Sequence, residues 1–183
     1  MIEAFLTSTA VVAFAEIGDK TQLLSFALAA RLRRPWPIVA GILIATLANH
    51  ALAGSVGVWI AHFLSSQVQR WTTTGAFFAF ALWALHPDSL GNSDVSGGRG
   101  VFATTVVTFF IAEMGDKTQL ATIALGARYQ ALVVVVLGTT LGMMIANVPA
   151  VLVGERLAER IPMQAMRWVA AATFAITGAL ALL

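Results

Sequence analysis

Two nearly identical polar stretches interrupt an otherwise hydrophobic sequence. The first, AEIGDKTQLL, begins at Ala15, and the second, AEMGDKTQLA, begins at Ala112. Each stretch holds a glutamate, an aspartate and a lysine within five residues. Carboxylate oxygens are the ligands that hard divalent cations prefer, and neighbouring carboxylates also bind protons. The duplicated motif therefore predicts a site for a cation, for protons, or for both.

Oxygen donors from both copies are the candidate metal ligands. The carboxylates come first, and amide and hydroxyl groups of the motifs and of the span after each complete the set: Glu16, Asp19, Thr21, Gln22, Asn49, Glu113, Asp116, Thr118, Gln119 and Asn147. Such a set favours Ca²⁺, Mn²⁺ or Mg²⁺ over Zn²⁺ or Cu⁺, which prefer histidine or sulfur. Asparagine inside a span is also a common contact between helices, so the two asparagines keep both interpretations. The chain has no cysteine, which excludes thiolate ligands and disulfides.

The charge of the two motifs suggests what they exchange. Four carboxylates and two ammonium groups, those of Lys20 and Lys117, sum to −2, which one divalent cation neutralises. Without the cation, carboxylates that lie close together in a low-dielectric setting hold protons instead. The metal ion and protons then compete for one site, which is the chemical basis of cation/proton exchange. The lysines are expected to balance charge, either beside the metal ion or while it is absent.

An alternative interpretation makes these charges purely structural. Salt bridges Glu16–Lys20 and Glu113–Lys117, at i,i+4 in a helix, would fasten the two halves of the chain together. This alternative explains the lysines but leaves the two aspartates without equal partners.

An enzymatic interpretation fits less well. Gly18-Asp19 resembles the end of the G-x-G-D string of intramembrane aspartyl proteases, but Glu16 stands where the first glycine belongs. The adjacent lysines would also hold the aspartates ionised, whereas an aspartyl dyad must share a proton. The sequence therefore predicts no enzyme.

Composition places the chain in a membrane. Of its 183 residues, 58% are hydrophobic and 11% are charged, which is typical of polytopic membrane proteins. A membrane-spanning helix needs about 20 mostly apolar residues, and six segments fit, at roughly 4–30, 37–63, 70–86, 101–127, 130–153 and 165–183. The lipid bilayer is thus an expected partner. Nucleic acid is not, because the net charge of +2 comes from a few loop arginines.

The two halves of the chain form an internal repeat. A shift of 97 positions aligns Ala15–Arg31 with Ala112–Arg128, and 12 of these 17 positions are identical. With three spans in each copy, the second copy must enter the membrane from the opposite face. We therefore predict an all-α polytopic membrane protein with six transmembrane helices as an inverted 3+3 repeat. The first repeat covers 1–86, a cytoplasmic linker covers 87–100, and the second, inverted repeat covers 101–183.

Arginines predict the orientation of these spans. Seven fall in the loops of one side and two, Arg70 and Arg128, on the other; the seven are Arg31, Arg33, Arg34, Arg99, Arg156, Arg160 and Arg167. The positive-inside rule then places the linker in the cytoplasm and both termini outside it.

The shape of the motif segment has two possible forms. In a regular helix, Glu16, Asp19 and Lys20 share one face. Gly18 inside the motif, and its counterpart in the second copy, could instead break the helix and bring threonine hydroxyls and backbone carbonyls to the same point. His50 has no counterpart in the second repeat and is interpreted as a bystander.

The duplicated E-x-G-D-K-T-Q, on the first and fourth of six spans, resembles the membrane family defined by E-x-G-D-[KR]-[TS]. That family includes bacterial manganese exporters and Golgi and chloroplast-envelope manganese/calcium transporters. The resemblance covers essentially the whole chain. It implies a secondary transporter that moves Mn²⁺ and/or Ca²⁺ out of the cytoplasm in exchange for protons. The family's functional positions map onto Glu16, Asp19, Lys20-Thr21, Glu113, Asp116 and Lys117-Thr118.

The same resemblance suggests where the protein works and what it binds. Many eukaryotic members carry a targeting extension and a long central loop, which are not seen in this sequence, so a bacterial inner-membrane protein is expected. No resident cofactor is expected, since the divalent cation is the substrate, and a homodimer is a candidate assembly. Two alternatives stay open: a passive divalent-cation channel and a non-transporting membrane assembly factor. Mn²⁺ and Ca²⁺ both accept carboxylate oxygens, so both stay candidate substrates.

Overall fold

Eight helices make up the part of the chain that the computed structural model describes, residues 1–86, 100–153 and 163–182. In chain order they are α1 (Ile2–Glu16), α2 (Lys20–Leu32), α3 (Pro35–Ala61), α4 (Ser66–Ala84), α5 (Val101–Glu113), α6 (Lys117–Tyr129), α7 (Leu132–Val153) and α9 (Met163–Leu180). The prediction of an all-helical fold is confirmed for these residues. The predicted linker, apart from Gly100, and the arginines at 99, 156 and 160 lie outside them.

Two of these helices, α3 and α7, are by themselves long and apolar enough to cross a membrane. The first and fourth predicted spans are each divided into two shorter helices, α1 with α2 and α5 with α6. The prediction of one regular helix through each motif is therefore wrong, and the alternative of a local break is the one observed. Each break falls inside the motif.

Glycine permits both breaks. Gly18 has a φ of 87° and Gly115 a φ of 76°, in a region where residues with a Cβ are strained. The residue before each glycine is extended, with ψ of 114° at Ile17 and 123° at Met114. Two segments 97 residues apart in the sequence thus turn in nearly the same way.

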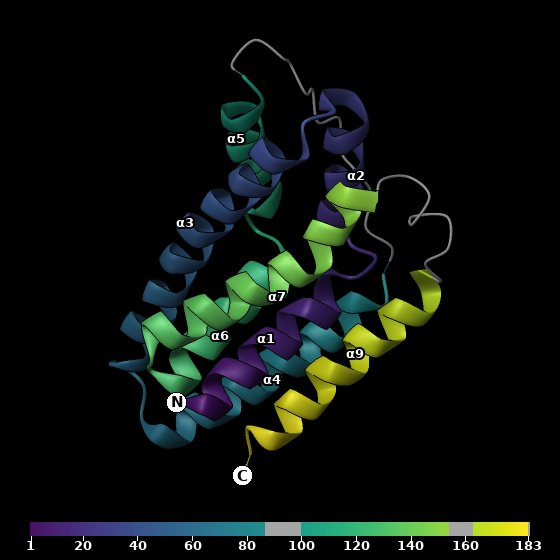
Figure 1. The fold of residues 1–183 in the computed structure, drawn as a ribbon. Helices are drawn as coiled ribbons and strands as arrows, with labels where there is room; N and C mark the ends of the chain where they lie inside the picture. The colour runs from purple at the N-terminus through teal and green to yellow at the C-terminus, as the bar shows by residue number, and fades with distance from the viewer. Residues whose placement is uncertain (87–99, 154–162, 183) are drawn as a thin grey trace.

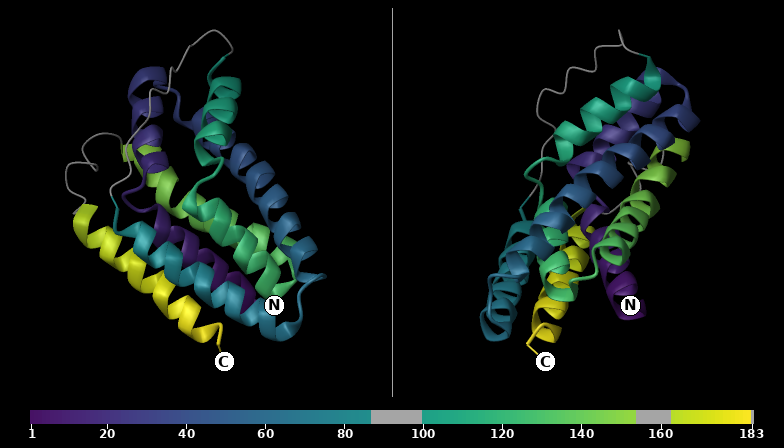
Figure 2. Two further views of the ribbon diagram at one scale, coloured as in Figure 1. Left: turned by 180° about the vertical axis from the view of Figure 1, so that it is seen from behind. Right: turned by 90° about the vertical axis from the view of Figure 1, so that its left-hand side faces the viewer.

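Helices of the first half pack against helices of the second half, and each such contact has an equivalent in the repeat (Figure 1). Helix α1 lies along α7, as α5 lies along α3, and α2 contacts α7, as α6 contacts α3. Helices α3 and α7 contact each other, and α4 lies beside α9, as both views in Figure 2 show. Helix α1 begins and α9 ends at the same end of the bundle.

Two apolar clusters flank the motif breaks. One, around Phe77 and Phe174, joins α1, α4, α6, α7 and α9, and the other, around Ile42 and Phe109, joins α1, α2, α3, α5 and α7. Glycines let the helices approach closely. A Cβ on Gly142 would lie 2.5 Å from the carbonyl oxygen of Thr9, so α1 and α7 are in backbone contact there.

The outer surface is apolar. All five tryptophans are exposed, by 38% to 72%, and exposed leucines, isoleucines and valines accompany them. Soluble monomers rarely expose so much large apolar surface, whereas lipid contact stabilises it.

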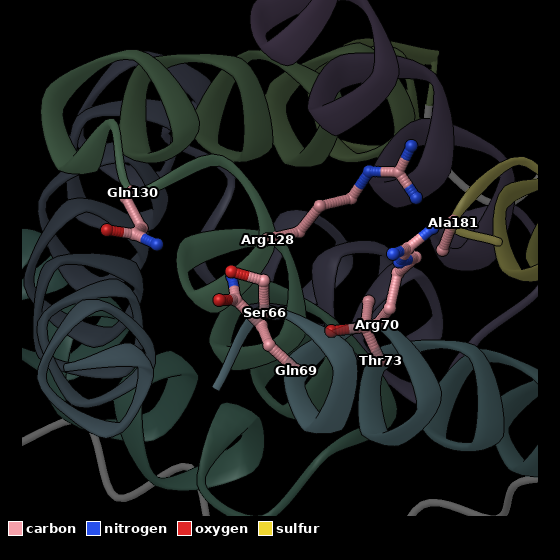
Figure 3. Close-up of a pocket in the computed structure, with 7 residues that line it drawn as sticks. All are labelled: Ser66, Gln69, Arg70, Thr73, Arg128, Gln130 and Ala181. Atoms are coloured by element: carbon pink, nitrogen blue, oxygen red, sulfur yellow. The ribbon is translucent and has the colours of Figure 1, made fainter. Parts of the chain in front are cut away.

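Arginines tie together one end of the bundle (Figure 3). Arg128, at the end of α6, donates from Nη2 to the carbonyl oxygen of Leu180 at 2.9 Å. Arg70 of α4 donates from Nη1 to the carbonyl oxygen of Leu182 at 3.4 Å. Both side chains line a pocket of about 260 Å³ between α4, α6 and the end of α9. Cations at a helix C-terminus satisfy its last carbonyls and oppose its dipole.

We expect Arg128→Ala to loosen this end of α9. Losing a cation at a helix C-terminus costs about 1 kcal/mol, so the apparent melting temperature of the purified protein should fall by about 2–4 °C. The matched control is Arg31→Ala, since Arg31 occupies the equivalent repeat position but is exposed and forms no hydrogen bond or ion pair with any described residue. Equal shifts in the two variants would contradict this assignment.

Candidate metal centre

The helix breaks place the four motif acids inside the protein. Glu16 is the last residue of α1, and Asp19 immediately precedes α2. Glu113 and Asp116 occupy the same positions at the break between α5 and α6. None of the four side chains is more than 2% exposed. A broken helix thus presents two carboxylates at each break without carrying them to the surface.

Carboxylates of the two motifs meet. One oxygen from each of Glu16, Asp19 and Asp116 lies within 4.8 Å of the other two. Oxygens on opposite sides of a Ca²⁺ ion, each about 2.4 Å from it, are about 4.8 Å apart. Glu113 is linked to the group through the Thr118 hydroxyl, which is 3.2 Å from Glu113 Oε2 and 3.1 Å from Asp116 Oδ2. The arrangement has the size of a site for one divalent cation.

Each motif lysine pairs with the aspartate of the other motif. Lys117 Nζ lies 2.5 Å from Asp19 Oδ1, and Lys20 Nζ lies 2.9 Å from Asp116 Oδ1. The alternative of salt bridges at i,i+4 is therefore wrong. The glutamate and the lysine four residues later do not share a helix, because one helix ends at the glutamate and the next begins at the lysine. Ion pairs that join the two halves are nevertheless present, as that alternative expected, but their partners differ.

The motif threonines lie at the same point. Thr21 donates a hydrogen bond to Glu16 Oε2, and Thr118 stands in the equivalent position beside Glu113. The other oxygen of each glutamate, Oε1, is buried and has no hydrogen-bond partner among the described residues. A buried carboxylate oxygen without a donor is costly, so these two oxygens are available to a cation or a proton.

The motif glutamines close the breaks. Gln22 Oε1 accepts the N–H of Gly18 at 2.9 Å, and Gln119 Oε1 accepts the N–H of Gly115 at 2.8 Å. These bonds satisfy backbone donors that the break releases in an apolar setting. In this structure the glutamines therefore fix the shape of the motif, and a ligand role for either one stays a prediction.

The two asparagines contact the motif helices in different ways. Asn49 Oδ1 accepts from Gln119 Nε2 at 2.8 Å, whereas Asn147 Oδ1 accepts from Ser25 Oγ at 2.8 Å. Ser25 was not among the predicted site residues. The signal that could have found it is its repeat counterpart, Thr122, which also carries a hydroxyl group. Metal binding by the asparagines stays a prediction, while their role as contacts between helices is observed.

A small cavity of about 10 Å³ lies beside the site. Its lining includes Asp19 and Lys117 of the site, His86 just after α4, and Arg167 near the start of α9. The cavity lies where α4 ends and α9 begins.

Comparison with known proteins identifies the class of molecule that carries this site. The family model described as "Divalent cation/proton antiporter GDT1" matches residues 4–92 and 101–183. The chain belongs to the GDT1 family. The prediction of a transporter rather than an enzyme agrees with this membership.

Relatives of this GDT1 protein include one from Vibrio cholerae named "Putative manganese exporter". It is 51% identical over 168 residues, a match that covers 91% of this chain and 84% of the relative. A GDT1-like protein of Synechocystis is 31% identical, and GDT1-like protein 5 of Arabidopsis thaliana is 30% identical; each match covers 88% of this chain and 87% of the relative. No solved structure matches the chain.

We expect Gly115→Ala to strain the second break without a steric clash. A Cβ at Gly115 would meet no atom within 4 Å, so the cost is the left-handed backbone alone, about 1–2 kcal/mol. Thermal unfolding in detergent should occur at a lower temperature, and divalent-cation transport in liposomes should slow because the acids on both sides of the glycine move.

The matched control for this variant is Gly75→Ala. Gly75 lies within α4, and a Cβ there would also meet no atom within 4 Å. Because alanine is favoured in a helix, this change should leave stability unaltered or raise it by up to about 1 kcal/mol. If both variants behave alike, the glycine conformation at the break is not what the motif requires.

Proposed function

We propose that this GDT1 protein exports Mn²⁺ from the cytoplasm in exchange for protons, with Ca²⁺ as an alternative substrate, at one site built by both motifs. The observation that carries the proposal is the meeting of carboxylates from the two motifs within 4.8 Å. A site that needs both halves of a duplicated chain suits a cation that is held between the halves. The manganese exporter name of the Vibrio cholerae relative supports Mn²⁺ as a substrate.

Binding of the cation is a competition with the lysines. Asp19 and Asp116 each hold an ammonium group from the other repeat on Oδ1, so a cation that takes these oxygen atoms displaces Lys117 and Lys20 from them. The unpartnered glutamate oxygens offer the cation two further ligands. The lysines thus serve as internal counter-charges that attract the aspartates when no cation does.

Proton exchange follows from the same charge count. Four carboxylates and two ammonium groups leave an excess of −2 that an apolar interior tolerates poorly. Once the divalent cation departs, two protons on the carboxylates restore neutrality. Cation and protons therefore occupy the site in turn, which makes the exchange obligatory rather than incidental.

We further propose six membrane crossings in two inverted repeats. Helices α1 and α2 together form one discontinuous crossing, α5 and α6 form another, and α3, α4, α7 and α9 supply the rest. The exchanged helix contacts support this arrangement, as does the start of α1 and end of α9 at one end of the bundle. Discontinuous helices at a repeat interface are a common means of building an ion site in secondary transporters.

The proposed orientation of the protein in the membrane places the small cavity on the cytoplasmic side. With both termini outside the cytoplasm in a bacterial inner membrane, the end of α4 and the start of α9 face the cytoplasm. The small cavity lined by Asp19, His86 and Arg167 then lies on the cytoplasmic side of the site. This is the side from which an exporter takes up its cation.

The test is Mn²⁺ transport by purified protein in liposomes, comparing Glu16→Gln with Glu113→Gln. Each change removes one carboxylate of the shared site, so each should lower transport by more than about tenfold, the range typical of damage to a metal site. Glu3→Gln is the matched control, because Glu3 is exposed at the start of α1. A normal rate in either motif variant rules out a shared carboxylate site.

A pH-sensitive dye inside the same liposomes separates the alternatives. An exchanger acidifies or alkalises the lumen in step with Mn²⁺ movement, whereas a passive channel moves Mn²⁺ down its gradient without proton counterflow. An assembly factor without transport activity shows no metal-dependent flux at all, and its lysine variants unfold.

A further inference from the structure

The pocket between α4, α6 and the end of α9 holds two positive charges without a counter-charge. Arg70 and Arg128 both extend their guanidinium groups toward the end of α9, where they donate to the carbonyl oxygens of Leu182 and Leu180 (Figure 3). None of the described residues that line the pocket is acidic. Neither arginine forms an ion pair with a described residue. The pocket therefore concentrates positive charge.

The end of α9 balances only part of this charge. A helix C-terminus carries about half of a negative elementary charge, against one full positive charge on each of the two arginines. Nη1 of Arg128 is also buried and has no hydrogen-bond partner among the described residues. A buried donor without an acceptor is unfavourable. The pocket is thus suited to an anion that also accepts hydrogen bonds.

An apolar groove between α4 and α6 begins where this pocket ends. Thr73 of α4 lines both cavities, and Ala127, which lines the groove, directly precedes Arg128. The groove has a volume of about 310 Å³ and extends to Phe80 of α4 and Leu120 of α6. Between Thr73 and Phe80 a helix advances about 10 Å, which is about two thirds of the hydrocarbon thickness of one leaflet. The groove therefore has room for the upper part of one acyl chain.

The pocket and the apolar groove together match the chemistry of a phospholipid, which carries charge at one end and hydrocarbon beyond it. Arginine binds phosphate oxygens through parallel hydrogen bonds, and basic pockets between membrane helices bind anionic headgroups. A headgroup with its own ammonium group finds no acidic partner among the described lining residues. The site thus favours an anionic headgroup over a zwitterionic one.

The level of the arginines along the bundle fits a lipid headgroup. They lie at the end of the bundle where α9 ends, and the exposed Trp71 follows Arg70 in the sequence. Exposed tryptophan is typical of the membrane surface. Lipid tails are as apolar as the groove, so an acyl chain gains close packing there but no release from water. The charge of the headgroup must therefore decide which lipid binds.

We propose that an anionic phospholipid binds at this place, with its phosphate between Arg70 and Arg128 and one acyl chain in the apolar groove. Nη1 of Arg128 donates to the phosphate, while Nη2 keeps its bond to Leu180. The lipid site goes beyond the proposed transport function and does not depend on it, because it uses no acid or lysine of either motif.

Lipid titration of the wild-type protein in detergent is the first test. Thermal unfolding is followed with added dioleoylphosphatidylglycerol, dioleoylphosphatidylcholine or inorganic phosphate, and native mass spectrometry counts bound lipid. Only phosphatidylglycerol should remain bound and raise the unfolding temperature with its concentration. Equal stabilisation by phosphatidylcholine overturns recognition of the anionic headgroup, and equal stabilisation by inorganic phosphate overturns a lipid as the ligand.

Arginine variants test the headgroup contact. Arg70→Gln and Arg128→Gln should each weaken the apparent affinity for phosphatidylglycerol by about tenfold or more, since each removes a charged hydrogen-bond donor. Each variant is compared with its own lipid-free unfolding temperature, which separates lost binding from lost stability. The matched control is Arg31→Gln, at the repeat position equivalent to Arg128 but exposed on α2. An unchanged affinity in both pocket variants overturns the proposal.

A pair of alanine variants in α4 tests the acyl chain. Ala76 lines the apolar groove, so Ala76→Phe should fill it and weaken phosphatidylglycerol binding in the same titration. Ala79→Phe adds the same side chain at an exposed position of α4 that does not line the groove, and its affinity should equal that of the wild type. Equal affinities in the two variants contradict an acyl chain in the groove.

Discussion

Charge inside an apolar bundle must be paired, and here the pairing joins one half of the chain to the other. Lys117 lies on Asp19, and Lys20 lies on Asp116. A buried ion pair whose partner is removed is strongly destabilising, so neither half can bury its motif alone. The repeat therefore folds as a unit around its polar centre, and the close glycine contacts and apolar clusters hold that centre together.

The same requirement explains why the motif helices are broken. A continuous helix would spread its acids and lysine over a turn of one face and consume every backbone group. The break ends one helix at a glutamate and starts the next after an aspartate, so both carboxylates leave the helix surface and face the other repeat. It also exposes backbone donors, which Gln22 and Gln119 satisfy. The residues of G-D-K-T-Q thus supply, in order, the turn, a carboxylate, a counter-charge, a hydroxyl and a cap.

Much of this centre could be predicted from the sequence, because duplication is a strong signal. The repeat of Glu16 and Asp19 at a shift of 97 positions identified the acids that meet, and the charge count indicated the kind of ion. The pairing of the lysines could not be predicted, since a single sequence favours local i,i+4 partners over partners 96 or 98 residues away. Ser25 was missed for a related reason: its contact with Asn147 depends on the packing of α2 against α7.

The two halves share a sequence pattern but not a hydrogen-bond pattern, and this difference bears on transport. Gln119 donates to the side chain of Asn49, whereas Gln22 donates to a backbone carbonyl of α7 and Asn147 accepts from Ser25 instead. In an inverted repeat that opens alternately to two sides, each half must adopt in turn the conformation of the other. In the exchange between inverted repeats proposed above, the equivalent residues with unequal partners are those whose bonds exchange. Because every bond lost in one half has a matching bond to gain in the other, the two conformations can lie close in free energy, which is the condition for a cation gradient or a proton gradient to drive the change.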